Sequence, residues 1–477
     1  MFLRIGNTGI IIAAGFPLRQ YSFAGEPPPS DDIAVALVAS RTSGPAPLAV
    51  HFSAVDTTAD ISGVTDTFRQ LLYTFDYGDS GSGTWPISGG SKNSDVGGPL
   101  GAHVFETPGT YTVRCTASRG ESSNYQEVTI TVTDPDTVYS GTNTVFVSPS
   151  ANYAGAPAGA QTVTSIPTIV SNRRYVLRRG ESFGSLNVPH EVSGVQIVAS
   201  DTAGAKPVVS SVQIGTSGLA PNANFPNDIS IVDVSVSGNI TQTAAGRKFL
   251  FLRVDQPSTL GYILNSAINY WATPGQFGTS MPYPGEYFLV GCTSIGNTAA
   301  EGIFGHMFQS AILGCDFKSA EQHTVRFWSS NQLFIAHSDL SGPSLDGSRH
   351  TLKLHSGDDG AIVGVTGTYA GASSFASRHN VIANNVISDT DDNNQFAAVI
   401  GPENSIVSQP LEDFIVENNR FKRGSSFVSD LQLAGRRMTA IGNTQFSGGA
   451  AASVGAPGLH NEGLSEGFNG PYYSSRT

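Results

Sequence analysis

The sequence predicts an all-β protein that consists of an N-terminal β-sandwich followed by a solenoid. Charged residues make up only 13% of the chain and glycines number 54, a composition that suits short strands and tight turns better than helices. Alternating strand-like segments separated by Gly and Pro fill the first part of the chain, which is typical of a sandwich. Later in the chain, a strand-like segment recurs at a spacing of roughly 23 residues, which indicates stacked coils.

We divide the chain of 477 residues into five parts. They are an N-terminal arm (1–32), the sandwich (33–135), a linker (136–150), the solenoid (151–448) and a C-terminal cap or tail (449–477). The arm contains the apolar run IIIAAGF, but no small-residue cleavage site follows it, so it is weak as a secretion signal. Whether the arm is a signal or an anchor stays open at this point. A tail that covers the last coil would protect its exposed strand edges.

Charge and cysteine content exclude several classes of protein. The net charge of −12, without a basic run, argues against nucleic-acid binding through phosphates. The sequence contains no stretch of roughly 18 apolar residues and therefore predicts no membrane-spanning helix. Three cysteines cannot form a disulfide framework, and Cys292 and Cys315 are expected as stacked apolar thiols on adjacent coils.

The sandwich region contains two distinctive segments. They are YTFDYGD (73–79), an aromatic-Asp-aromatic-Gly-Asp turn, and HVFETPGTYTVRCTAS (103–118), which follows the pattern H-x-[FY]-x-x-x-G-x-Y-x-V. Both segments resemble the PKD family of immunoglobulin-like modules. The resemblance covers roughly residues 33–135, with a long insert between Trp85 and His103. It implies a sandwich that acts as a spacer or adhesion unit. We expect Asp76 and Asp79 to hold a turn rather than to bind a substrate.

The solenoid's repeat is clearest at one recurring position. Steps of 23, 23, 47, 34 and 24 residues separate the equivalent positions Cys292, Cys315, Ser338, Asn385, Asn419 and Asn443. Asn suits such a turn because it tolerates left-handed backbone and can bond the coils above and below.

The segments RRYVLRRGESF (173–183) and VSGVQIVASDTAGAKPVV (192–209) resemble the opening coils of right-handed parallel β-helices of the pectate-lyase type. The resemblance implies that an outward wall of the solenoid binds or degrades polysaccharide, often with Arg or Lys as the base. Calcium assists some members, but SDTDDNN (388–394) does not match a known cation loop, so we predict no cofactor and no metal site.

The candidate site is the strand HTVRFW (323–328) and its altered copy HTLKLH (350–355). As the same strand of successive coils, with EGIFGH (301–306) one coil earlier, they would direct their alternate apolar residues inward. Arg326 and Lys353 would then lie side by side on an exposed wall and neutralise the carboxylates of an acidic sugar, or form a structural salt-bridge network with nearby acids.

If the site is catalytic, Lys353 is our candidate base, with His350 or His355 as alternatives. Arg326 would neutralise the carboxylate and His323 would orient the substrate or donate a proton. The candidate substrate-binding residues are His306, His337, Trp328, Asp358 and Asp359.

Two function classes follow. The first is a spike or fibre at a virion surface, docked through its arm on other virion proteins and forming a homotrimer, whose solenoid binds and in one version depolymerises host surface polysaccharide. The alternative is a secreted bacterial polysaccharide lyase or hydrolase with the PKD-like module as spacer. An adhesin-like structural protein without chemistry is a third reading, so enzyme activity is left open.

Overall fold

The computed structural model describes most of the chain from residue 32 onward. The described residues are 32–215, 226–242, 246–256, 262–263, 285–294, 302–318, 320, 323–341, 350–354, 377–388, 397–401, 411–422, 430–433, 435–446, 453–455 and 472–473. The arm, apart from residue 32, lies outside them.

The N-terminal region is a two-layered sandwich, as predicted. Its larger sheet has the order β3 (Ser43–Pro45), β10 (Ser122–Thr133), β9 (Gly109–Arg119), β6 (Leu72–Asp76) and β7 (Ser94–Gly97), and its smaller sheet has the order β2 (Val38–Ala39), β4 (Leu48–Ser53) and β8 (Leu100–Phe105). A separate pair is formed by β1 (Ile33–Ala34) and β5 (Thr58–Ala59), and short helical turns are α1 (Thr67–Gln70), α2 (Pro135–Val138) and η1 (Gly141–Asn143).

The acidic residues of the YTFDYGD segment (73–79) stabilise a turn, as expected. Asp76 accepts a hydrogen bond of 2.9 Å from the backbone N–H of Gly78 and another of 2.9 Å from the side chain of Asn93. Asp79 lies 2.9 Å from Nε2 of His103. Both carboxylates therefore contribute to the local structure of the sandwich.

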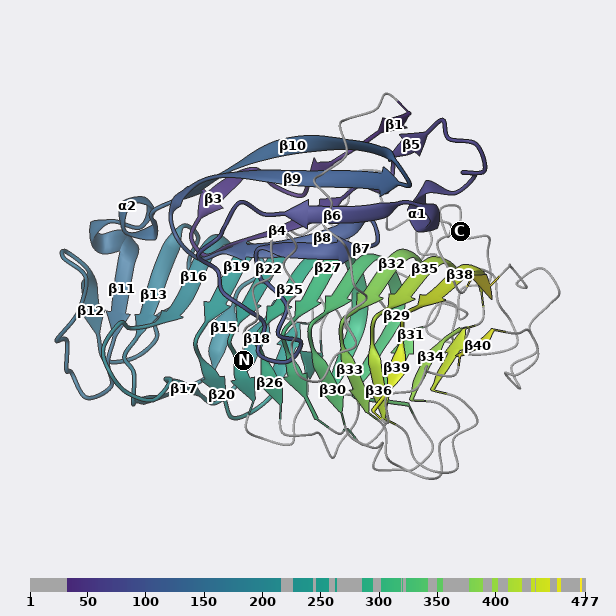
Figure 1. The fold of residues 1–477 in the computed structure, drawn as a ribbon. Coiled ribbons are helices and arrows are strands. Elements are labelled where there is room, and N and C mark those ends of the chain that lie inside the picture. The colour runs from purple at the N-terminus through teal and green to yellow at the C-terminus, as the bar shows by residue number, and fades with distance from the viewer. Residues whose placement is uncertain are drawn as a thin grey trace, which may run out of the picture.

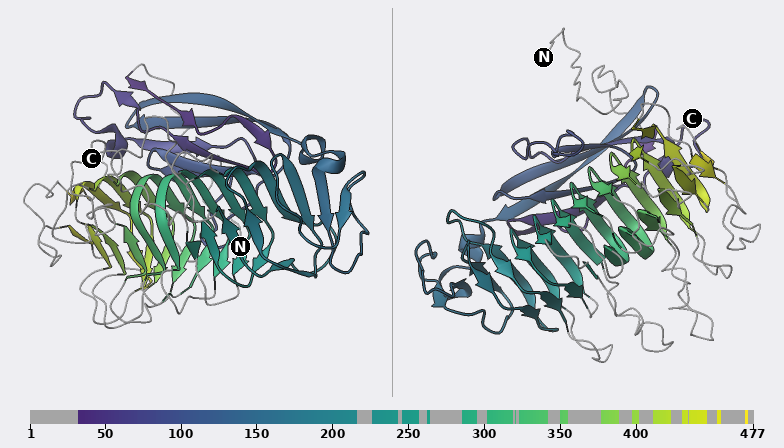
Figure 2. Two further views of the ribbon diagram at one scale, coloured as in Figure 1. Left: turned by 180° about the vertical axis from the view of Figure 1, so that it is seen from behind. Right: turned by 90° about the horizontal axis from the view of Figure 1, so that it is seen from below.

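The second region is a parallel β-helix, which confirms the predicted fold class (Figures 1 and 2). Each full coil contributes one strand to each of three walls. The first wall contains β11 (Thr144–Val147), β13 (Arg173–Leu177), β16 (Ser193–Ala199), β19 (Asn227–Val232), β22 (Arg247–Leu252), β25 (Gly285–Val290), the second half of β27 (Ile303–Leu313) and of β29 (Val325–Ala336), β32 (Arg378–Ala383), β35 (Glu412–Glu417), β38 (Arg436–Ile441) and β41 (Tyr472–Tyr473), with β12 (Gln161–Val163) beside β11.

The other two walls follow the first in every coil. The second wall contains β14 (Ser182–Phe183), β17 (Val208–Val209), β20 (Ser235–Val236), β23 (Asp255–Gln256), β26 (Thr293–Ser294), β28 (Asp316–Phe317), β30 (Asp339–Ser341), β33 (Val386–Ser388), β36 (Arg420–Lys422) and β39 (Thr444–Gln445). The third wall contains β15 (Leu186–Val188), β18 (Val212–Ile214), β21 (Ile240–Gln242), β24 (Tyr262–Ile263), the first half of β27 and of β29, β31 (Leu352–Leu354), β34 (Ala398–Ile400), β37 (Leu431–Leu433) and β40 (Ser453–Gly455).

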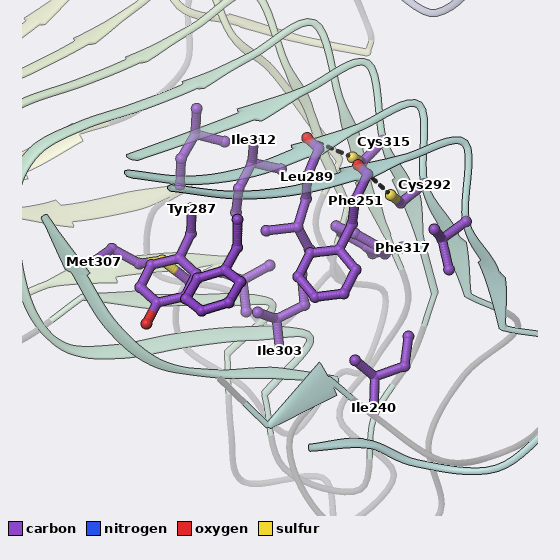
Figure 3. Close-up of a cluster of buried hydrophobic side chains, with 14 of the residues drawn as sticks. Ile240, Phe251, Tyr287, Leu289, Cys292, Ile303, Met307, Ile312, Cys315 and Phe317 are labelled. Carbon is purple, nitrogen blue, oxygen red and sulfur yellow. Dashed lines mark hydrogen bonds between the residues drawn. The ribbon is translucent and has the colours of Figure 1, made fainter. Parts of the chain in front are cut away.

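Stacked apolar side chains fill the solenoid, because alternation turns every second residue of each strand inward. Figure 3 shows part of this core, including Cys292 and Cys315. Both cysteines are free and buried, and their thiols donate to the carbonyl oxygens of Phe251 and Leu289 at 3.2 Å. Burial raises the pKa of the Cys315 thiol well above its ordinary value, so it stays protonated. The expectation of stacked thiols is confirmed.

The recurring Asn position forms an internal ladder of hydrogen bonds. Oδ1 of Asn385 accepts from the N–H of Ser338 at 2.9 Å, and Oδ1 of Asn419 accepts from the N–H of Asn385 at 3.0 Å. The side-chain NH2 of Asn385 donates to the carbonyl oxygen of Ile335 at 2.9 Å. The ladder bonds neighbouring coils as the sequence predicted. The left-handed backbone, however, belongs to the preceding residue, for example Asn384 with φ +59°.

We expect Asn385→Ala to lower the free energy of unfolding by about 2–4 kcal/mol, because the buried N–H of Ser338 and C=O of Ile335, both in the preceding coil, lose their side-chain partner. Asn187→Ala, at an exposed position of β15, is the matched control and should change stability by less than about 0.5 kcal/mol. Denaturant titration followed by circular dichroism measures both values. Equal losses in the two variants would contradict a stabilising role for the ladder.

Candidate functional site

The two strands singled out by the sequence lie side by side on the third wall in the predicted register. Val325 pairs with Leu352, Arg326 with Lys353 and Phe327 with Leu354. The preceding coil supplies β27, in which Ile303 pairs with Val325. The apolar partners are buried in the solenoid core, so Arg326 and Lys353 take adjacent outward positions about 4.8 Å apart along the stack.

The exposure of these two cations differs from the expectation of an open basic wall. Lys353 is only 4% exposed and Arg326 is half-buried. Alternation along a strand determines the direction in which a side chain points, but it carries no information about what lies over that side chain. Lys353 is therefore buried on the outward side of the wall.

Two histidines lie beside this pair. His323 is 2% exposed, its ring centroid is 5.9 Å from that of His350, and its Nδ1 lies 2.8 Å from the carbonyl oxygen and 3.1 Å from the backbone nitrogen of His350. Burial lowers the pKa of His323 well below its ordinary value, and the positive charges of His350, Arg326 and Lys353 lower it further. At neutral pH, His323 is a neutral imidazole and a weak base.

The remaining candidates have different outcomes. His355, Asp358 and Asp359 lie outside the described residues. His306 belongs to β27 and pairs with Ser329 of β29, the strand that also contains Trp328. Only the positions of these two residues in their strands are described.

His337 does not lie on the third wall, contrary to our assignment to a sugar site there. It follows β29 at the end of the first wall, has φ +59° and is 4% exposed. Its ring stacks on Trp85 of the sandwich at 5.4 Å with an interplanar angle of 11°. His337 therefore contributes to the contact between the two regions of the chain.

That contact is extensive. The outward side chains of the first wall form one buried cluster with those of β4 and β8. In the ribbon views, the sandwich lies along this wall (Figures 1 and 2). From the solenoid the cluster contains Phe146, Val176, Val198, Val232, Leu250, Leu252, Phe288, Val290, Ala311, Leu313, Phe334, Ala336, Val381, Ala383 and Ile415, and from the sandwich Ala49, Phe68, Trp85, Leu100, Ala102 and Val104. The first wall is thus apolar on both faces.

Comparison with known proteins identifies the sandwich. Residues 34–132 match the PKD domain family. This part of the chain is a PKD domain. A search of curated proteins finds no match. Among solved structures, the chain is similar to the A-module of a mannuronan C-5 epimerase from Azotobacter vinelandii, with 13% identity, a TM-score of 0.35 and coverage of 61% of this chain and 86% of that one. A similarity at this level assigns no activity.

The PKD domain packs along the solenoid. A spacer would instead hold the solenoid at a distance. Polar contacts accompany the apolar ones. Arg41 bonds Asp228 at 2.8 Å, and the N–H of Gly98 donates to Glu417 at 2.8 Å. His51 is fully buried here, and burial lowers its pKa to about 4, so it remains neutral at pH 7.

Sequence reasoning missed this interface although a signal was present. Strands buried on both faces read as continuous apolar runs rather than as alternating ones. FLFL (249–252) and YFLV (287–290) of the first wall are such runs, whereas the third-wall strands alternate apolar and polar residues at LNV (186–188) and LKL (352–354). The runs could have predicted a covered wall.

Gly314 offers a test of the contact, because a Cβ there would lie 2.4 Å from Trp85 and the residue has φ +59°. We expect Gly314→Ala to lower the free energy of unfolding by about 3 kcal/mol through backbone strain and a clash with Trp85. Gly180→Ala is the matched control, since Gly180 has φ +78° and no atom within 4 Å of the Cβ position. It should cost only about 1–2 kcal/mol. Thermal unfolding of both variants measures the difference, and equal values would argue against a tight PKD contact at this position.

Proposed function

We propose that the solenoid binds an acidic polysaccharide on its third wall, around Arg326 and Lys353. The pairing of these two cations on adjacent strands carries the proposal. The first wall is covered by the PKD domain where the two pack together. On the second wall, the outward carboxylates of Asp255, Asp316 and Asp339 form ion pairs with Lys206 or Lys318, so these cations are already engaged by protein carboxylates.

Arg326 is the contact group in this proposal, because it is less deeply buried than Lys353 and a guanidinium can bond a sugar carboxylate through two N–H groups. Lys353, buried beside it, strengthens the positive potential since charges interact more strongly away from water.

The geometry favours binding over cleavage. A lyase base must reach the proton next to the sugar carboxylate, and its pKa must lie near the working pH. Lys353 is buried, and the pKa of His323 is well below 6.5. The secreted polysaccharide lyase is the second candidate. His350 favours this candidate because it is half-buried and lies beside His323. The charges of His350, Arg326 and Lys353 all act on the imidazole of His323, so the three groups lie near one another.

Arg326→Gln should weaken binding of a polyuronate by roughly tenfold and reduce the dependence of affinity on salt, because a charge-assisted contact is lost. Arg420→Gln removes a cation of the second wall, where Arg420 lies 4.2 Å from the ring centroid of Phe446, and should leave binding unchanged. Titration calorimetry with acidic and neutral polymers measures both. Equal affinity of wild type and Arg326→Gln for the polyuronate would refute the site, and release of unsaturated uronate ends that stops in Lys353→Ala would favour the lyase.

We further propose that the binding solenoid is the host-facing part of a virion spike that attaches through its arm and forms a homotrimer. The Gly-, Ser- and Asn-rich solenoid supports this setting. Mass spectrometry of purified particles should find peptides of this chain, including peptides from residues 1–32. Recovery of the chain only as a free secreted protein that has lost the arm would instead support the secreted lyase or hydrolase.

None of the helices in the described part of the chain has the length and apolarity that a transmembrane helix requires.

A further inference from the structure

Three polar side chains form a chain of hydrogen bonds across the boundary between the PKD domain and the solenoid. Oγ of Ser88 lies 2.8 Å from Nδ1 of His337, and Nε2 of His337 lies 2.8 Å from Oδ1 of Asp95. Ser88 and Asp95 belong to the PKD domain, whereas His337 lies 242 residues after Asp95 in the solenoid. The group therefore exists only when the two regions are packed together.

The partners of these groups determine where each proton lies. Oδ2 of Asp95 accepts a 2.6 Å hydrogen bond from Tyr77, whose pKa is raised well above its ordinary value by burial and by the charge of Asp95. Asp95 is thus the acceptor in both of its contacts. Nε2 of His337 consequently carries the proton, which leaves the lone pair of Nδ1 directed at the hydroxyl of Ser88.

The hydroxyl of Ser88 completes the arrangement. Its oxygen accepts a 3.1 Å hydrogen bond from the N–H of Gly90, so its own proton is free to be donated to Nδ1 of His337. A serine bonded to an imidazole that is in turn oriented by a buried carboxylate is the arrangement that activates a serine nucleophile. In the serine proteases, Nε2 of the histidine bonds the serine and Nδ1 bonds the aspartate. Here Nδ1 bonds Ser88 and Nε2 bonds Asp95.

Burial holds the base in place and leaves the nucleophile reachable. Asp95 is 9% and His337 4% exposed, whereas Ser88 is half-buried on a glycine-rich segment. Trp85 stacks on the imidazole, which limits its rotation. Such a preorganised donor, base and carboxylate can transfer a proton without rearrangement.

We propose that Ser88 is the nucleophile of a second, ester-hydrolysing site formed at the junction of the PKD domain and the solenoid. Ser88 Oγ attacks the carbonyl carbon of an ester while its proton passes to Nδ1 of His337. The C–O bond to the alcohol breaks, the alcohol leaves with that proton, and the acyl group stays on Ser88. Water, deprotonated by His337, then attacks the acyl group and releases a carboxylic acid and free Ser88.

Crowding beside Ser88 favours a small acyl group. A Cβ at Gly90 would lie 3.3 Å from both Oγ of Ser88 and Cε1 of His337, which is a tight contact, so a side chain at this position would crowd the reacting atoms. We therefore take an acetyl ester, which has a small acyl group, as the substrate class. This inference does not depend on the proposed polysaccharide site.

The test uses the full chain and a biotin-linked fluorophosphonate, which reacts covalently with activated serines. We expect labelling of the peptide that contains Ser88, and hydrolysis of p-nitrophenyl acetate that falls at least about 100-fold in Ser88→Ala. Arg41→Ala, which breaks the interdomain ion pair with Asp228 but leaves the hydroxyl in place, is the control and should keep both properties.

Asp95 acts as a positioning residue in this proposal. Asp95→Asn should lower kcat by roughly tenfold or more with little change in KM, because the imidazole loses its preferred tautomer. Wild-type protein that is not labelled at Ser88, or a folded Ser88→Ala variant that hydrolyses the ester at the wild-type rate, would overturn the proposal. The labelling of wild type decides the question even if a variant fails to fold.

Discussion

The packing of the PKD domain against the first wall is the contact on which the rest of the structure depends. Strands β4 and β8 are buried along their whole length. Leu48, Val50 and Phe52 of β4 face the sandwich core, whereas Ala49 belongs to the cluster shared with the solenoid. Burial of apolar surface stabilises by about 25 cal/mol per Å², so a wall this long and apolar would be costly to leave in water.

This contact also assigns roles to the other walls. With the first wall covered, a ligand of the solenoid has the second and third walls available, and their charged residues are arranged differently. Asp255, Asp316 and Asp339 of the second wall pair with Lys206 or Lys318, while Arg326 and Lys353 are adjacent cations on the third wall. The PKD domain thus takes part in the site indirectly, by determining which surface remains for a ligand.

The same contact brings together chemistry that neither region contains alone. His337 provides an imidazole from a turn of the solenoid, and the PKD domain provides Ser88, Asp95 and the stacking ring of Trp85. Close approach requires small residues on the PKD side. A Cβ at Gly97 would lie 2.1 Å from Glu417, and one at Gly98 would lie 2.8 Å from Val381.

The sequence by itself determined the features that follow from local periodicity. Alternation and the repeat step predicted the coils, the pairing of Arg326 with Lys353 and the ladder through Asn385 and Asn419, because each depends only on strand geometry repeated from coil to coil. Only the tertiary structure decided which wall is covered, how deeply Lys353 is buried and that His337 bonds Asp95. These properties arise from surfaces far apart in the chain, and strand periodicity carries no information about which of them meet.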